Sequence, residues 1–393
     1  MSLLNYYTAC GISPVHYLAS SVQEHLERRQ SLYDMLGLPG LMFRGAKVLE
    51  IAAGSGQNSL YVSMQLPSKY VIIEPNPAAL KQIEGTYADF NFPHTRPEVL
   101  PVTLEEYGSG GKFDVVICEN WLGASDHERS LAGTIADLVA PGGAMVLTAL
   151  SIAGWLPNLI RYGLVQKMSA GKPDDYQTRV AMALEAFSPH LRTIAGMTRR
   201  HEDWVKDNMV NPTYLVQGLT LEMILQEAAP KGFTVFGSSP GFITEWRWFK
   251  QLTGEGKKKN ENALECYERL THNFLDYRRT FPERDAGLNA QLSGLAAALL
   301  SALAGIDAMG RAEVPSAKYD EIIILLRRIK DNVNTVSGEM GAAIDEAIRA
   351  LDSPEVTPSA LSEMENFKHW FGRETLYFSL IRSNAVPDSP HEG

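Results

Sequence analysis

The segment Val48–Gly56 joins a short apolar run to a turn that contains two glycines. The apolar run Lys47–Ile51 predicts a buried β-strand, and the stretch 58–66 that follows the turn predicts a helix. A glycine turn between a strand and a helix lets the backbone approach a ligand and directs helix N-terminal amides at its polar groups. Such turns also occur in folds that bind no nucleotide, so the turn alone leaves both interpretations open.

Short apolar stretches and helix-like stretches alternate along residues 47–150. The further predicted strands are Tyr70–Ile73, Val99–Thr103, Phe113–Cys118 and Ala144–Leu150, and the further predicted helices are Ala78–Thr86 and Leu131–Val139. Apolar strands separated by helices predict an α/β fold, with a doubly wound, mostly parallel sheet covered on both faces. Ligands of such sheets bind at the carboxyl ends of the strands.

Beyond residue 150 the pattern becomes mainly helical. Residues 151–230 predict a helical insertion, and Phe233–Phe236 with Ile243–Phe249 predict an antiparallel hairpin at the edge of the sheet. Period-two spacing puts Trp246 and Trp248 on one face of that hairpin, which we expect in the core. The C-terminal region is predicted to be all-helical, with helices near 261–280, 286–309, 316–351 and 358–371.

The expected domains follow from these changes of pattern. They are an N-terminal helical lead-in or lid at 1–40, a sheet domain with its helical insertion at 41–253, a C-terminal helical region at 260–383 and a disordered tail at 384–393. The last apolar piece, Thr375–Ile381, is expected to dock back on the core. The run Leu292–Leu303 is shorter than the roughly 20 residues that a membrane span needs, so we interpret it as a buried helix.

The overall charge and the cysteines limit the partners and the compartment. A formal net charge of -10 argues against binding to nucleic acid or to anionic membranes, which favour basic surfaces. Cys10, Cys118 and Cys266 are far apart and have the spacing of neither a disulfide framework nor a zinc site, and no metal site is indicated. Residues 1–7 lack the basic stretch and long apolar run of a signal peptide, so we expect a cytoplasmic protein.

Glu74 lies at the end of the second predicted strand, 20 positions after Gly54. An acidic residue about this far beyond a glycine loop is placed to bind both hydroxyls of a ribose. A surface carboxylate at a strand end is the alternative interpretation.

These motifs together resemble the class I S-adenosylmethionine-dependent methyltransferases. Matching segments are Glu50–Gly56 for the first strand and its turn, Glu74 for the ribose acid, Phe113–Asn120 for the fourth strand and Pro141–Gly143 for the turn before the fifth. The resemblance implies S-adenosylmethionine as the cofactor. It also implies cofactor contacts from Glu50, Ala52, Gly54, Gly56, Glu74, Pro75, Thr103, Leu104, Glu119 and Asn120.

The sequence departs from the family pattern at two places. Ala52 stands where the family has its first glycine, which we expect to be tolerated with φ below zero. The acid that usually follows the third strand is absent, and Thr103 or the backbone of Leu104 takes its place in the comparison. NAD(P) is the rival cofactor, but its fingerprint needs a third glycine or alanine where this chain has Ser59.

His127 and His201 are the candidate general bases, because an imidazole titrates near neutral pH. His127 follows the fourth strand and is alternatively a helix-start residue capped by Ser125. His201, with Asp203 as its possible partner, lies in the insertion after the fifth strand, where class I methyltransferases commonly build substrate specificity. Trp121 is either a wall of the substrate pocket or a core anchor.

Several functions stay open on the sequence alone. The leading hypothesis is O- or N-methylation of a small molecule or sugar-containing metabolite. The alternatives are methylation of a protein side chain and a cofactor-binding pseudoenzyme that recruits a protein partner. The C-terminal helices form a bundle on the catalytic domain, a homodimer interface or a cap over the pocket, and Tyr6 and Tyr7 are candidate lid residues.

Overall fold

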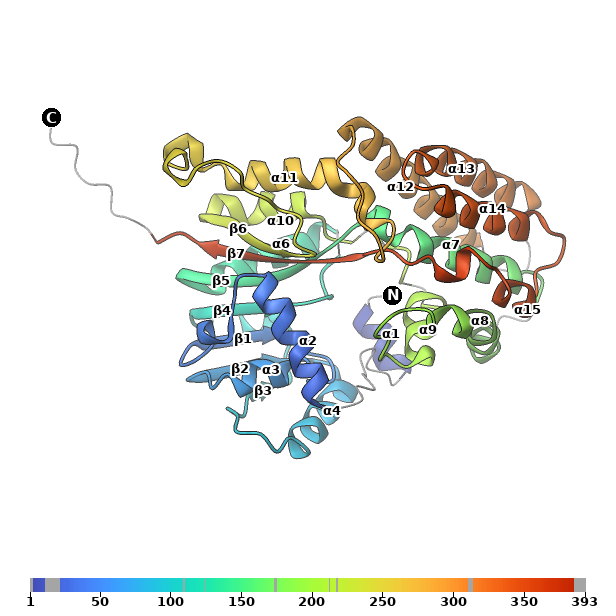
Figure 1. Cartoon of the computed structure of the whole chain (residues 1–393). Coiled ribbons are helices and arrows are strands. Elements are labelled where there is room, and N and C mark those ends of the chain that lie inside the picture. The colour runs from blue at the N-terminus through green and yellow to red at the C-terminus, as the bar shows by residue number, and fades with distance from the viewer. Residues whose placement is uncertain are drawn as a thin grey trace.

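The computed structural model describes residues 3–10, 22–108, 110–123, 125–172, 175–211, 213–216, 218–309 and 314–384. These residues form a seven-stranded sheet with the strand order β3-β2-β1-β4-β5-β7-β6 (Figure 1). The strands are β1 (Lys47–Ile51), β2 (Lys69–Ile73), β3 (Glu98–Leu100), β4 (Phe113–Cys118), β5 (Val139–Leu150), β6 (Phe233–Ser239) and β7 (Thr375–Arg382). Strands β1 to β5 pair in parallel, and β7 is antiparallel to both of its neighbours. The predicted fold class, a doubly wound and mostly parallel α/β sheet, is confirmed.

Helices cover both faces of the sheet, and each face has its own apolar core. One core joins the sheet to α2 (Val22–Met35), α3 (Ser59–Met64) and α4 (Pro77–Ala88). The other core joins it to α6 (Asp126–Leu138), α10 (Leu221–Ala228) and α11 (Lys259–Leu270). The short helix α5 (Leu104–Tyr107) contributes Leu104 to this second core. The strands β1, β2 and β4 are therefore buried on both faces, as their continuous apolar sequences predicted.

The antiparallel partner of β6 corrects the predicted hairpin. We predicted that Ile243–Phe249 pairs with the strand at 233–236, but β7 takes that position and pairs with β5 on its other side. β7 buries Leu376, Phe378 and Leu380 completely, whereas residues 244–249 are all exposed. Trp246 and Trp248, which we expected in the core, have exposed fractions of 93% and 60%. The strand beside β6 is therefore the segment whose apolar side chains are buried in the sheet, and the strand-like alternation of Ile243–Phe249 does not produce a strand.

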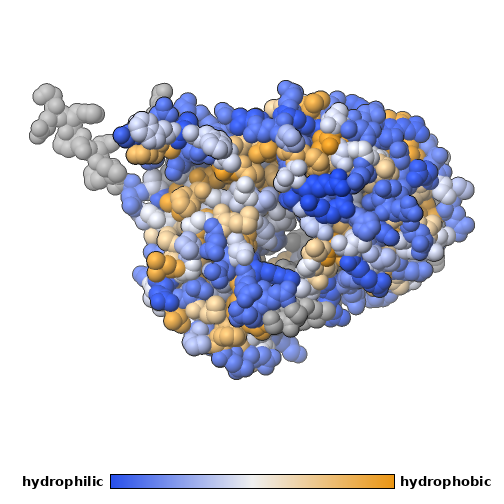
Figure 2. Space-filling model, viewed as in Figure 1, coloured by the Kyte–Doolittle hydropathy of each residue, from blue (hydrophilic) through white to orange (hydrophobic). Residues whose placement is uncertain are grey.

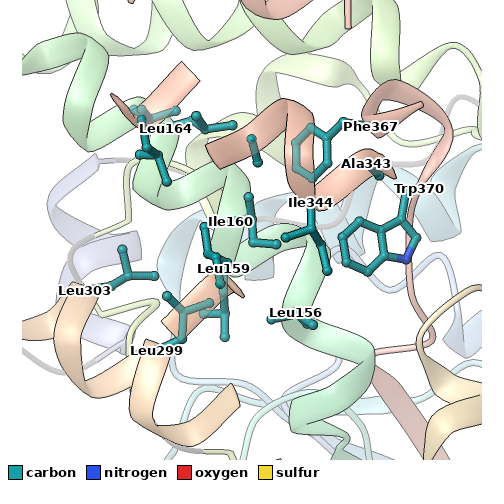
Figure 3. Close-up of a cluster of buried hydrophobic side chains, with 14 of the residues drawn as sticks. Leu156, Leu159, Ile160, Leu164, Leu299, Leu303, Ala343, Ile344, Phe367 and Trp370 are labelled. Carbon is teal, nitrogen blue, oxygen red and sulfur yellow. The ribbon is translucent and has the colours of Figure 1, made fainter. Parts of the chain in front are cut away.

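A separate helical unit lies beside the sheet and comes from two parts of the chain. Its first part, between β5 and β6, contains α7 (Ile152–Ser169), α8 (Tyr176–Leu191) and α9 (His201–Asn208). Its second part, between β6 and β7, contains α12 (Ala286–Met309), α13 (Ser316–Asn334), α14 (Gly338–Asp352) and α15 (Pro358–Ser362). Figure 3 shows Leu156, Leu159 and Ile160 of α7 at the centre of this core, among side chains of α12 and α14.

The C-terminal helices differ in detail from the prediction. The predicted helix 316–351 is two helices, α13 and α14, which a turn at Thr335–Ser337 separates. The apolar face that suggested a dimer is covered within the chain, because Ile322, Leu326 and Ile329 lie in the core of the helical unit. Among the described residues, α12 alone is long and apolar enough to cross a membrane by length and composition. The predicted disordered tail lies almost wholly outside the described residues, which end at Asn384.

Candidate functional site at the carboxyl edge of the sheet

The turn after β1 has the backbone that a glycine loop requires. Gly54 and Gly56 have φ values of +59° and +74°. A Cβ atom at position 56 would lie 3.0 Å from Cγ1 of Ile83 on α4, so glycine is needed there for space as well as for conformation. Ala52 corrects our expectation, because its φ is +58° and not below zero. The turn therefore has a left-handed residue at this position without a glycine.

Glu74 connects the glycine loop to the end of β2. Its side chain is 5% exposed, and Oε2 accepts a hydrogen bond from the Gly54 amide at 2.9 Å. Oε1 accepts one from the Asn76 amide, also at 2.9 Å. Burial raises the pKa of this carboxyl group above its ordinary value. Because each carboxylate oxygen has more than one acceptor site, Glu74 keeps the capacity to bind ribose hydroxyls, and it fits the nucleoside end of the cofactor.

Pro75, Thr103 and Leu104, which we predicted to contact the cofactor, lie in segments that also have structural roles. Pro75 lies between Glu74 and Asn76, and the Asn76 side chain caps α4 by accepting from the Ala78 amide at 3.0 Å. Thr103 caps α5 and forms a reciprocal capping box with Glu106. The side chain of Leu104 is buried in the core. Any adenine contact at this position therefore belongs to the backbone or to the Thr103 hydroxyl hydrogen.

Glu119, at the end of β4, lies in an ion pair that the sequence did not reveal. Nη2 and Nη1 of Arg29 donate to its two carboxylate oxygens at 2.7 Å and 3.0 Å. The two side chains are about 10% exposed or less, and Arg29 also donates to the Tyr33 hydroxyl at 3.0 Å. Arg29 and Tyr33 are four residues apart on α2, which crosses in front of the strands (Figure 1). Two polar residues four positions apart on one face of a helix were the sequence signal that could have pointed to this ion pair.

Glu50, on β1, is a second buried acidic residue near Glu119, and it is 6% exposed. The Tyr70 hydroxyl of β2 donates to its carboxylate. Burial raises the pKa of Glu50 to about 7, and the nearby Glu119 also raises it. A carboxyl group with this pKa is partly protonated near neutral pH.

Asn120 follows Glu119 in a left-handed conformation, with φ +56°. Its amide donates to Oγ1 of Thr148 on β5 at 2.8 Å, and its side-chain amide donates to the Tyr377 hydroxyl on β7 at 3.4 Å. The Asn120 side chain is exposed at the carboxyl edge, where a ligand can reach it. Trp121 is half-buried and packs on the core between the sheet and α6, so both of its predicted roles remain compatible with its position.

His127 lies in the first turn of α6, with a side chain that is 67% exposed. Its Nε2 atom is 3.1 Å from Oε1 of Glu105 on α5. Ser125 caps the same helix by accepting from the Glu128 amide at 3.2 Å. This placement matches the helix-start alternative, and the catalytic role of His127 stays a prediction.

His201 begins α9 and lines a pocket of about 380 Å³. The pocket is formed by Met197, Thr198, Arg199, Arg200, His201 and Glu202. Burial, together with the charge of Arg192, lowers the pKa of the imidazole. Asp203 is two residues further on the same helical turn, where side chains diverge. Within the part of the chain that the structure describes, no hydrogen bond joins His201 to Asp203, so the structure does not bring this predicted pair together.

Helix α2 connects the His201 pocket with the carboxyl edge of the sheet. Nη1 of Arg28 donates to Oγ1 of Thr198 at 3.1 Å and to the Gly196 carbonyl at 3.3 Å. The next residue, Arg29, holds Glu119 at the end of β4. The pocket and the carboxyl edge are therefore tied to adjacent residues of one helix.

The candidate lid residues lie on α1 (Leu3–Cys10) and contact the helical unit. The Tyr6 hydroxyl is 2.9 Å from that of Tyr176 and donates to the Lys206 carbonyl at 3.0 Å. The Tyr7 hydroxyl donates to Asp207 at 2.6 Å. Figure 1 shows α1 between the sheet and α9, and Figure 2 shows the surface hollowed between the sheet and the helical unit.

Glu374 is a further ionisable residue that sequence reasoning missed. It precedes β7 and lies beside the end of β5, where its carbonyl accepts from the Ser151 amide at 2.8 Å. Its carboxylate accepts from Asn158 of α7 at 2.8 Å, and burial raises its pKa. The residue is near the edge because β7 returns there from the end of the chain, which no local pattern signals.

Comparison with known proteins gives one match to a family model and several to solved structures. Residues 49–145, from β1 into β5, match the model of a family described as a methyltransferase domain. Among curated proteins, none matches this sequence.

Three of the solved structures that are similar to this chain are 11–15% identical to it in sequence. PKMT2 from Rickettsia typhi matches over 64% of this chain and 52% of its own, with 15% identity and a TM-score of 0.40. This chain therefore spans about half the length of that protein. Magnesium protoporphyrin IX methyltransferase from Synechocystis PCC 6803 matches over 60% and 90%, with 13% identity and a TM-score of 0.36. The cyclopropane synthase MmaA2 from Mycobacterium tuberculosis matches over 91% and 84%, with 11% identity and a TM-score of 0.34.

Proposed function

We propose that this chain, a class I S-adenosylmethionine-dependent methyltransferase, methylates an oxygen or nitrogen atom of a small molecule, with sugar-containing metabolites in the candidate set. The family, the enzyme class and the cofactor that the sequence predicted are confirmed by the match over residues 49–145. S-adenosylmethionine supplies an electrophilic methyl group, which the acceptor atom attacks in line with the breaking bond. The nature of the acceptor is the part that we propose.

The surroundings of the carboxyl edge support a small acceptor. α2 is bonded both to Glu119 at the edge and to Thr198 of the helical unit. α1 is bonded to α9 through Tyr6 and Tyr7. An acceptor between the sheet and the helical unit is thus bordered by two N-terminal helices, which suits a small molecule better than a protein segment in a long groove. This bordered position is the observation that carries the proposal.

His201 is the general base that we favour. Its pKa is lowered by burial, which keeps the imidazole in the neutral form that accepts a proton. It lines a pocket whose wall contacts α2, whereas His127 is exposed and paired with Glu105. A base is needed only for a hydroxyl or a protonated amine acceptor.

The acceptor class is tested with methyl-labelled S-adenosylmethionine and a cell extract separated by size. We expect label in products of the small-molecule fraction and none in proteins. Label on protein side chains would replace the proposal with the protein-acceptor alternative. If no S-adenosylhomocysteine is released with either fraction, the result would favour the alternative that the protein is a cofactor-binding pseudoenzyme.

The base is tested with two matched variants, His201→Ala and His127→Ala, on the acceptor identified above. His201→Ala is expected to lower kcat about 100-fold, the lower range for a general base, with unchanged affinity for the cofactor. It is also expected to remove the acidic limb of the pH profile, while His127→Ala changes neither. The reverse pattern would assign the base to His127.

The ribose role of Glu74 is tested by calorimetric titration of S-adenosylhomocysteine. Glu74→Ala removes a buried acceptor, and hydrogen bonds to charged groups contribute about 1.5–3 kcal/mol each, so the Kd is expected to rise at least tenfold. Glu84→Ala is the control, because Glu84 is exposed on α4. Equal affinity in both variants would remove Glu74 from the cofactor site.

A cytoplasmic location and the absence of a nucleic-acid partner remain part of this proposal. The buried, unpaired Cys118 and Cys266 and the net charge of -10 support them.

A further inference from the structure

Three aromatic side chains project from the loop between β6 and α11. Trp246, Trp248 and Phe249 have exposed fractions of 93%, 60% and 70%. We call residues 245–250 the aromatic loop. Trp248 and Phe249 contact each other edge to face, with ring centroids 5.9 Å apart, and Lys250 Nζ lies 4.6 Å from the Trp248 ring centroid. Large aromatic side chains gathered on a surface mark a site of interaction.

Both ends of the segment that carries the aromatic loop are fixed to the body of the protein. Before the loop, the Thr244 carbonyl accepts from Asn262 of α11 at 2.9 Å. After it, the Asn260 side chain accepts from the Val235 amide at 2.8 Å and donates to the Phe233 carbonyl at 3.0 Å. The aromatic side chains are therefore presented outward by an anchored segment, and their exposure is a property of the folded chain.

The charge around the aromatic loop is opposite to that of the whole protein. Residues 245–261 contain the cations Arg247, Lys250, Lys257, Lys258 and Lys259, against the acids Glu245, Glu255 and Glu261. This stretch is thus positive within a chain of net charge -10. Exposed tryptophan and phenylalanine with lysine and arginine beside them are the combination that enters the headgroup region of a bilayer, where lysines attract anionic lipids.

We propose that the aromatic loop docks this protein on the surface of an anionic lipid bilayer. The expectation that the protein has no membrane partner rested on its total charge, which this locally positive segment does not share. The two tryptophans were separately expected in the core, and the structure exposes them. In Figure 1 the loop lies before α11 at the end of the molecule away from α12–α14. The proposal does not depend on which acceptor is methylated.

The test is co-sedimentation of the whole protein with vesicles, together with tryptophan emission. Vesicles of phosphatidylcholine are compared with vesicles that also contain phosphatidylglycerol. We expect binding to the anionic vesicles, a blue shift of the emission and weaker binding at higher salt. Each lysine near such a surface contributes about fivefold in affinity, so Lys257→Gln, Lys258→Gln and Lys259→Gln together are expected to weaken binding more than tenfold.

A matched pair of variants assigns the binding to the aromatic loop. Trp246→Ser, Trp248→Ser and Phe249→Ser together are expected to abolish it, with the far-UV spectrum unchanged. Leu41→Ser with Ile324→Ser removes exposed apolar side chains elsewhere, 77% and 57% exposed, and is expected to bind like the parent. Equal binding by the loop variant and the parent would overturn the proposal. The proposal would also be overturned if the parent did not bind vesicles but formed a dimer that the loop variant dissociates. The loop would then be a protein interface.

Discussion

Ala52 adopts a left-handed backbone in the glycine turn after β1, with φ +58°. This conformation costs an L-residue with a side chain about 1–2 kcal/mol, whereas glycine adopts it freely but loses about 0.5–1 kcal/mol of chain entropy. We therefore expect Ala52→Gly to raise the free energy of unfolding by roughly 0.5–1 kcal/mol, measured by urea denaturation.

Ala53 provides the matched control for that substitution. It is the next residue, it does not have a positive φ, and its methyl group packs on the core beneath α2. Ala53→Gly is expected to lower the free energy of unfolding by about 0.5–1 kcal/mol. If the two substitutions shift stability in the same direction, backbone strain at Ala52 is not the cause.

Glu50 predicts a pH dependence of stability. Its folded-state pKa of about 7 is above the roughly 4.3 of an unfolded glutamate, so ionisation favours the unfolded chain. The contribution of this group to the free energy of unfolding is highest below about pH 4. It falls by roughly 3 kcal/mol as the pH rises to about 7. Glu50→Gln keeps an acceptor for Tyr70 without the charge, and its gain in stability is expected at pH 8 but not at pH 4.5.

Urea denaturation at several pH values measures this difference. Glu84→Gln, an exposed change on α4, is the control and is expected to follow the parent at every pH. A stability gain of Glu50→Gln that is constant across pH would show that desolvation of its charge is not responsible.

The position of Glu74 was predictable because it depends on where one strand ends, which is a local property of the sequence. The partner of Glu119 was not, since Arg29 is 90 residues away and is brought there by the packing of α2. The predicted backbone conformation of Ala52 was wrong for another reason. The resemblance to the family fixed its place in the sequence, but its conformation depends on how β1 and α3 are joined in the folded chain.

At the scale of elements, the start of α7 lies against the backbone of the chain just before β7. A Cβ at Gly154 would lie 2.0 Å from the Arg373 carbonyl oxygen. Gly154→Ala therefore forces the two segments apart, and overpacking of this kind typically costs about 1–3 kcal/mol. We expect a loss of at least about 2 kcal/mol in the free energy of unfolding, because the obstacle is backbone.

Gly294 on α12 is the control for the same chemical change. A Cβ there has nothing within 4 Å, and glycine disfavours helix interiors by about 1 kcal/mol relative to alanine. Gly294→Ala is therefore expected to stabilise the protein by up to about 1 kcal/mol. A stable Gly154→Ala variant would mean that α7 can move relative to β7.

Elements within residues 47–150 were predicted well because each short strand is bounded by its own turn signals. β1 and β4 have the predicted bounds, and β2 differs by one residue. β5 is a correction, because it begins at Val139 and includes Pro141–Gly143, which we predicted to be the turn before it. The strand pairing at the other edge was wrong for a physical reason. The stretch Ile243–Phe249 has the alternation of a strand, but pairing is decided by long-range burial, and β7 supplies it from beyond the second helical insertion.

At the scale of the whole molecule, the helical unit is a single core made by two insertions. α7 from the first insertion packs among α12 and α14 from the second (Figure 3), and α8 from the first packs on α15 from the second. A fragment of residues 259–371 alone lacks α7 and therefore leaves Leu299, Leu303 and Ile344 without their main cover. We expect this fragment to show no cooperative unfolding transition in urea by circular dichroism, in contrast to the whole chain. A sigmoidal transition of the fragment would mean that the second insertion is an independent domain.

The place of β7 in the sheet has a consequence for the synthesis of this protein. β5 and β6 emerge from the ribosome early, but the strand that lies between them is translated after the whole segment 240–374. At 5–20 residues per second the two strands wait on the order of ten seconds with unpaired edges that other nascent chains can join. We therefore expect soluble production of this chain to depend on protection of those edges during translation, by chaperones or by slow expression.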